Sequence, residues 1–154
     1  MILPLPTLLC GALLGAVLWS ATLSADPVAS RWSSITFADD RHIKTEIADT
    51  PAQRALGLMY RETLGENQGM LFVYPDSDIR YVWMKNTLLA LDIVFLNENG
   101  IIVSMLPNLA PCSQQYCPIY PSKAVARYML EVNAGFIDKH QLKTGQEVII
   151  DYRH

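Results

Sequence analysis

The segment LDIVFLNENGIIVSML, residues 91–106, constrains the possible folds most, because it is typical of two strands joined by a tight turn. Apolar runs rich in β-branched residues flank NENG on both sides, and an Asn-Gly step is the strongest short-range signal for a hairpin. Runs of the same kind recur along the chain between turn residues. They predict further strands over 34–37, 41–49, 69–75, 80–84, 124–133 and 145–151.

Helical signals are short and few. In TPAQRALGLMY, Thr50 suits the N-cap, Pro51 the first helical position, and Gln53 completes a capping box. A second short helical piece is predicted for FIDKH, residues 136–140. About seven short strands with one or two short helices, and no alternation of strands with long helices, favour a mainly β domain: a compact antiparallel β-sandwich or barrel.

The first 25 residues carry no charged side chain and include the apolar stretch LLCGALLGAVLW, which has the length of a signal-peptide core. The small residues Ser24 and Ala25 end this segment and predict a cleavage site. An uncleaved anchor is the alternative, since about 20 apolar residues can span a bilayer, but the early prolines favour cleavage. We therefore expect one exported domain over 26–154, in the periplasm or outside the cell, or held at the inner membrane if the segment is retained.

The charges of the chain are 12 basic and 15 acidic, giving a net charge of −3, and they are interspersed. Nucleic-acid binding requires a concentrated cationic face, so nucleic acid is not an expected partner. Membrane contact is expected only through the N-terminal segment. The three histidines, His42, His140 and His154, show no ligand spacing. No metal and no cofactor is therefore predicted.

Cys112 and Cys117 lie in the sequence PCSQQYCP, whereas Cys10 lies inside the export segment. An even pair of cysteines in an oxidising compartment is interpreted first as a disulfide. Closing so short a loop stabilises a fold by about 2 kcal/mol in the chain-entropy treatment. A metal site is the alternative, but this spacing without a nearby histidine matches no closed zinc pattern.

The block VWMKNT places Lys85 and Asn86 directly behind a predicted strand, and Asp92 follows inside the apolar run LLALDIVFL. A lysine and an amide at the rim of a sheet can hold a carboxylate, a sugar hydroxyl or a phosphate. The alternative is a solvated turn. An ionised Asp92 requires solvent or a partner, and Arg54, Arg61 or Lys85 could supply one in a purely structural ion pair.

Glu131, in the strand YMLEVNAG, raises the same question as Asp92. It shares a predicted strand face with Met129 and Asn133. Asp92 and Glu131 could form a catalytic acid–base pair if they faced each other across a cleft, about 5 to 10 Å apart. A structural role for both carboxylates is the competing interpretation.

The chain also resembles one known family, the exported prokaryotic proteins called domain of unknown function 192. The matching residues are RALGLMYRETLGENQGMLFVY (54–74), VWMKNTLLALDIVFLNENGII (82–102) and YMLEVNAG (128–135), in that order. Where relatives commonly have Ile-Pro after the threonine, this chain has Leu88-Leu89. The resemblance implies a β-sandwich related to jelly rolls, without an activity, substrate or cofactor.

Three functions remain open from the sequence. The favoured one is non-enzymatic binding of a small polar or anionic ligand, or of a glycan fragment, by Lys85, Asn86, Arg54 and Arg61, with Asp92 holding a cation in place. The second is a hydrolase using Asp92 and Glu131. The third is a cell-envelope interaction module in which the polar block is purely structural.

Overall fold

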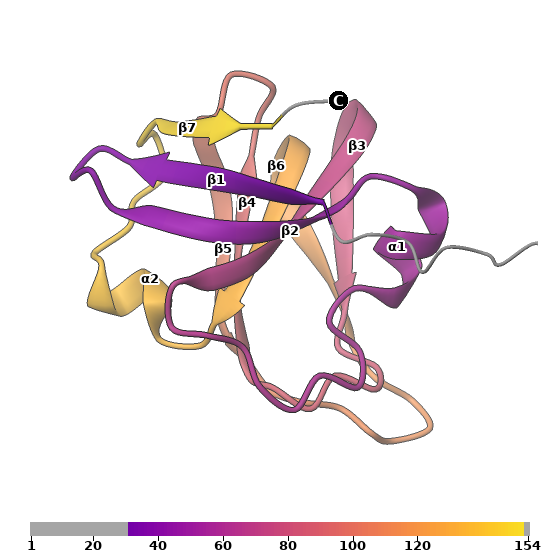
Figure 1. The fold of residues 1–154 in the computed structure, drawn as a ribbon. Helices are drawn as coiled ribbons and strands as arrows, with labels where there is room; N and C mark the ends of the chain where they lie inside the picture. The colour runs from indigo at the N-terminus through magenta and orange to yellow at the C-terminus, as the bar shows by residue number, and fades with distance from the viewer. Residues whose placement is uncertain (1–30, 153–154) are drawn as a thin grey trace, which may run out of the picture.

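Seven strands and two short helices make up the fold of the computed structural model, which describes residues 31–152 (Figure 1). The predicted export segment 1–25 and Cys10 lie outside the described residues. Within the described part, no helix is long and apolar enough to cross a membrane. In chain order the elements are β1 (Trp32–Phe37), β2 (His42–Ala48), α1 (Pro51–Leu56), β3 (Gln68–Trp83), β4 (Leu91–Leu96), β5 (Ile102–Leu109), β6 (Ile119–Asn133), α2 (Phe136–Lys139) and β7 (Val148–Asp151).

The strands form one curled sheet in the order β5-β4-β6-β3-β2-β1-β7. The beginnings of β5 and β7 also lie side by side. The Ile102 N–H donates to the Gln146 carbonyl, and the Val148 N–H donates to the Gly100 carbonyl, both at 2.9 Å. The sheet thus curls toward closure, which confirms the predicted sandwich or barrel class. One pair departs from the antiparallel expectation: β2 and β3 run parallel, connected through α1.

The two longest strands, β3 and β6, pair over most of their length and are both strongly bent in Figure 1. The sequence predicted two strands separated by a turn at PDSD, but β3 continues through this segment. Its register against β6 shifts between Val73 and Asp78 and again between Ile79 and Tyr81. Pro75 lies in the first irregularity, where its missing N–H is tolerated because the regular ladder is already interrupted.

Alternation along the strands produces two buried clusters on the two faces of the sheet. One contains Val94 and Val132 with residues of β1, β2 and α2, and the other contains Ile93 and Met129 with residues of the turn after α1 and of the bent β3. The register pairs Ile93 with Glu131, and Asp92 with Val132. Directly opposed residues point to the same face of a sheet, so Glu131 belongs to the second face and Asp92 to the first.

The short helix α1 forms as its sequence predicts. The Thr50 side chain accepts a hydrogen bond from the Gln53 N–H at 3.2 Å, and the Gln53 side chain accepts one from the Thr50 N–H at 3.0 Å, which completes the capping box. The helix ends at Gly57, whose φ is +49°. A side chain there would be strained, and its Cβ would lie 3.1 Å from the Phe72 ring. Glycine therefore sets both the length of α1 and its close approach to β3.

Candidate functional site

A pocket of about 190 Å³ lies between α1, the turn after it, both halves of the bent β3, and β6. We call it the α1 pocket. This volume is far above the roughly 15 Å³ that one water molecule needs, so a small organic molecule fits. The lining residues that bear on its chemistry are Arg54, Gly57, Phe72, Tyr74, Thr87 and Glu131; most of the others, such as Leu58, Val82 and Met129, are apolar.

Among the described residues, Glu131 is the only carboxylate that lines this pocket. It is 7% exposed, and no hydrogen bond or ion pair to its carboxyl group exists within residues 31–152. Burial disfavours the charged form and raises the pKa of Glu131 to about 8. The group is therefore a carboxylic acid without a partner in this part of the chain, held mostly neutral near pH 7 at the wall of a cavity.

Two hydroxyl groups add to the polar surface of the pocket. Thr87 is 5% exposed, and neither its hydroxyl nor that of Tyr74 forms a hydrogen bond with another described residue. Burial raises the pKa of Tyr74, and the nearby Glu131 raises it further, against the opposing effect of arginine charge. Apart from the largely exposed Tyr81, the pocket thus holds three oxygen-bearing side chains whose oxygens form no hydrogen bond within the described chain.

Two arginines lie close to the ring of Tyr74. The guanidinium of Arg54 lies 5.3 Å from the Tyr74 ring centroid, and that of Arg80 lies 4.0 Å from it. Arg54 Nη1 donates to the carbonyl groups of Asp49 and Val73. These bonds hold Arg54 at the pocket wall, but they do not neutralise Glu131, whose raised pKa has burial as its cause.

Arg61 lies beside the α1 pocket and makes an ion pair. Its two Nη atoms donate to the two carboxylate oxygens of Glu46 at 2.8 and 2.6 Å, and this pairing raises the pKa of Arg61. Both residues line a second hollow of about 170 Å³, which shares Leu56 and Gly57 with the α1 pocket. Of the residues proposed from sequence for ligand binding, Arg54 lines the α1 pocket itself and Arg61 its neighbour.

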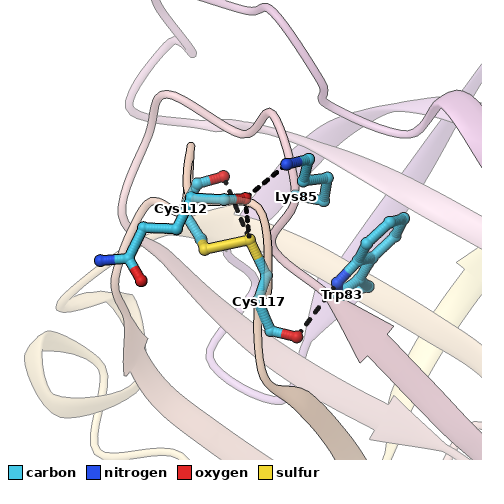
Figure 2. Close-up of a disulfide and its surroundings, with 5 residues drawn as sticks. Trp83, Lys85, Cys112 and Cys117 are labelled. Carbon is cyan, nitrogen blue, oxygen red and sulfur yellow. Dashed lines mark hydrogen bonds between the residues drawn. A yellow bond between two sulfur atoms is a disulfide. The ribbon is translucent and has the colours of Figure 1, made fainter.

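Lys85 and Asn86 support the disulfide loop instead of lining the α1 pocket. Cys112 and Cys117 are joined by a disulfide, as predicted, with their Cα atoms 6.0 Å apart. Figure 2 shows Lys85 Nζ donating to a carbonyl of this loop, that of Gln114, and the Trp83 indole donating to the Cys117 carbonyl.

The backbone of the same block is bound to the same loop. The Asn86 N–H donates to the Cys112 carbonyl at 2.9 Å, and Thr87 forms a β-bridge with Cys112. The Asn86 side chain donates to the Tyr60 hydroxyl at 2.8 Å. The polar block thus anchors the segment that carries Thr87 into the pocket wall.

Asp92 lies on the opposite face and is fully buried. One carboxylate oxygen accepts the Asn108 N–H at 2.8 Å, and the other accepts the Ile137 N–H, in the first turn of α2, at 2.7 Å. The partners of Asp92 are therefore backbone N–H groups, and not Arg54, Arg61 or Lys85, as the sequence had suggested for a structural ion pair. Because Asp92 and Glu131 point to opposite faces of the sheet, the acid–base pair required by the hydrolase alternative is not formed.

Sequence reasoning did not single out Tyr74 or Thr87. A signal for Tyr74 existed, because Phe72 and Tyr74 alternate in MLFVY and so share one strand face. No comparable signal existed for Thr87, which reaches the pocket only because β3 bends. Within residues 31–152, no group of three or more His, Cys, Asp or Glu side chains could hold a metal ion.

Comparison with solved structures identifies two similar bacterial proteins. A Sinorhizobium meliloti 1021 protein, provisionally described as a transcription regulator, is 32% identical with a TM-score of 0.70 over 79% of this chain and 94% of that one. A protein of unknown function from Novosphingobium aromaticivorans DSM 12444 is 28% identical, also with a TM-score of 0.70, over 84% and 94%. No curated protein matches significantly. The family DUF192, described as Uncharacterized ACR, matches residues 34–150, and the chain belongs to this family.

Proposed function

We propose that this domain binds a small molecule in the α1 pocket, and that the molecule has a largely apolar body and one polar group. The observation that carries the proposal is Glu131, a buried carboxyl group that faces a cavity and has no partner within residues 31–152. Its carboxyl group is exposed only to this cavity, where it can form hydrogen bonds with a bound molecule. A ligand that donates to or accepts from this carboxyl group gives it the partner that the described chain does not supply.

The composition of the pocket wall supports a ligand of mixed character. Phe72, Val82 and Met129 supply apolar surface, whereas Tyr74, Thr87 and Glu131 supply hydrogen-bonding groups. Ligand sites commonly combine apolar walls with a few polar groups that orient the ligand. The sequence-based expectation was a small polar or anionic ligand, or a glycan fragment. The apolar walls shift the proposal toward a molecule with a larger apolar part.

Binding without catalysis is favoured because, among the described residues, no second carboxylate lies opposite Glu131 in the pocket. Carboxylate-based hydrolysis uses two such groups on either side of the scissile bond. The interaction-module alternative remains an untested prediction. Exposed apolar surface would support it, and the cross-strand pair Trp83 and Ile119, 49% and 62% exposed, supplies some.

We further propose that binding takes place outside the cytoplasm. The support is the charge-free apolar stretch within residues 1–25 and the Cys112–Cys117 disulfide, a bond typical of oxidising compartments. Detection of the protein by mass spectrometry in a periplasmic fraction, with a new N-terminus near residue 26, tests this part separately. Recovery in the cytoplasm with the full N-terminus contradicts it.

A fragment screen by thermal unfolding tests the binding proposal. A ligand at 100 times its Kd adds about 2.7 kcal/mol to the unfolding free energy, which raises the midpoint by roughly 8 to 16 °C for a domain of this size. Hits are then measured by calorimetry on the wild type, on Thr87→Val, which removes only the pocket hydroxyl, and on Glu98→Gln, an exposed control in the β4–β5 turn. Absence of any hit, or hits that bind Thr87→Val and a Glu131→Gln variant unchanged, contradicts the proposal.

A further inference from the structure

Building on the proposed function, we propose that the polar group of the ligand is a protonated amine, so that the α1 pocket recognises small organic ammonium ions. Glu131, Tyr74 and Thr87 together would receive the ammonium group, and the apolar wall would receive the remainder of the molecule.

The first argument is the missing counter-charge of Glu131. A buried carboxylate requires a cation or several hydrogen bonds to remain ionised. The two arginines nearest to Tyr74 do not provide this: Arg54 donates to backbone carbonyl groups, and Arg80 donates to the Ala126 carbonyl at 2.9 Å and to the Asp76 carboxylate at 2.7 Å. A cation from outside the chain is the complement that the pocket lacks.

The second argument is the match of donors to acceptors. An alkylammonium group has three N–H donors and no acceptor. Apart from the largely exposed Tyr81, the pocket offers three oxygen groups that no described residue occupies, the Glu131 carboxylate and the hydroxyls of Tyr74 and Thr87. A neutral alcohol has a single donor, and a carboxylate ligand has none when it is ionised. Of these three kinds of ligand group, the ammonium is the one that donates to all three oxygens and also supplies the counter-charge of an ionised Glu131. The two hydroxyls donate as well as accept, so an anionic group could accept from them but would repel the ionised Glu131.

The other charged groups around Glu131 limit how it can be neutralised. Tyr74 of β3 interacts electrostatically with Glu131 and also with Arg80 and Arg54, of which Arg54 lines the pocket. The residues directly paired with Glu131 on β3 and β4 are Met70 and Ile93. On β2, the same face carries Glu46, two strands away, which is already bound by Arg61. Arg54 is the feature that opposes a cation, and an anionic ligand at Arg54 is therefore the rival that the test must include.

Ammonium binding has a consequence that neutral ligands lack. Because the pKa of Glu131 is about 8, its carboxyl group is about nine-tenths protonated at pH 7. An ammonium ion binds the ionised form, so the carboxyl group loses its proton to solvent while the ammonium group keeps its own. Each binding event then releases close to one proton at pH 7, and affinity for the amine rises with pH up to about pH 8.

The test compares three probes with one ring and three charges: benzylamine, benzyl alcohol and benzoate. Isothermal titration of the whole protein in two buffers that differ in ionisation enthalpy gives the affinity and the number of protons released. The same titrations are made on Glu131→Gln, which keeps the shape of the side chain but cannot ionise, and on Glu98→Gln, which removes an exposed charge outside the α1 pocket. Far-ultraviolet circular dichroism verifies that both variants are folded.

We expect benzylamine to bind most tightly, to release close to one proton, and to lose at least about tenfold in affinity in Glu131→Gln, since charge-assisted hydrogen bonds are strong. Glu98→Gln should behave as the wild type. Equal binding of benzyl alcohol without proton release overturns this inference and leaves the proposed function standing. Tightest binding of benzoate also overturns it, in favour of Arg54. Binding of none of the three overturns it as well, and the proposed function falls only if the wider fragment screen is negative too.

Discussion

The stability of this domain should depend on pH through Glu131, and the variant Glu131→Gln isolates that dependence. Burial raises the pKa of this carboxyl group from 4.5 to about 8. Between these two values the folded protein retains a proton that the unfolded chain has already lost. The contribution of Glu131 to the unfolding free energy is therefore fully present below about pH 4.5, falls as the pH rises, and is lost once the pH passes about 8.

The expected magnitude follows from the size of this window. Each pH unit within it corresponds to about 1.36 kcal/mol. Between about pH 5 and pH 8 the contribution of Glu131 falls by about 3.5 kcal/mol, after allowance for partial titration at both ends. The Glu131→Gln variant has no ionisable group at this position, so it should lack this fall. At about pH 8 it should be more stable than the wild type, by up to roughly 10 to 20 °C in thermal midpoint.

Urea unfolding followed by circular dichroism, at four pH values from about 5 to 8, measures the difference between wild type and Glu131→Gln. Other titrating groups cancel in this difference, including His140, whose pKa burial lowers. Glu98→Gln serves as the matched control, because it removes the same group from an exposed position outside the α1 pocket. If the difference in unfolding free energy between Glu131→Gln and wild type stays constant within about 0.5 kcal/mol from about pH 5 to pH 8, the reasoning is refuted.

Three further predictions concern the supports around the site. Asp92→Asn replaces one acceptor of a backbone N–H by a donor, and should lower the unfolding free energy by roughly 2 to 3 kcal/mol in urea; a change below about 0.5 kcal/mol would contradict the buried role. Replacing Cys112 and Cys117 by serine should cost about 2 kcal/mol, measured against the oxidised wild type, and the reduced wild type should behave as the variant does. Arg61→Met should cost only about 0.5 to 1 kcal/mol, because its ion pair with Glu46 is partly solvated, and added salt should reduce this loss; a loss that is independent of salt would point to packing instead.

Local signals in the sequence account for most of the elements of the fold. The capping box at Thr50 and Gln53 and the Asn-Gly turn before β5 are both interactions within a few residues, so pattern and propensity suffice to predict them. The disulfide belongs to the same group, because its two cysteines are five residues apart. What these signals share is that both partners lie in the same short stretch of chain.

The bend of β3 and β6 could not be predicted in this way. Residues 78–83 pair with residues 119–126, about 40 positions later, and nothing within PDSD distinguishes a bent, irregular strand from a true turn. Pro, Asp and Ser favour turns in general, whereas here long-range pairing overrides that preference. The α1 pocket could not be predicted from sequence patterns either. It is lined by Phe72 from the first part of β3 and by Val82 from the second part, and these lie near each other because β3 bends.

Asp92 and Glu131 illustrate where sequence reasoning about a site stops. Each is a single carboxylate inside an apolar strand, each is more than nine-tenths buried, and the two strands are neighbours. They differ in their partners: backbone N–H groups of Asn108 and Ile137 satisfy Asp92, whereas Glu131 faces a cavity. Backbone donors carry no residue signature, and these come from 16 and 45 positions away.

The Asp92 carboxyl group accepts two backbone N–H groups and so is satisfied where it is buried, whereas Glu131 has no such donor and destabilises the fold when it ionises. The two substitutions should therefore act in opposite directions at about pH 8, with Asp92→Asn lowering stability and Glu131→Gln raising it. A group retained at a cost to stability is expected where it serves binding. The predicted difference in sign separates Asp92, whose partners are part of the fold, from Glu131, whose partner is the proposed ligand.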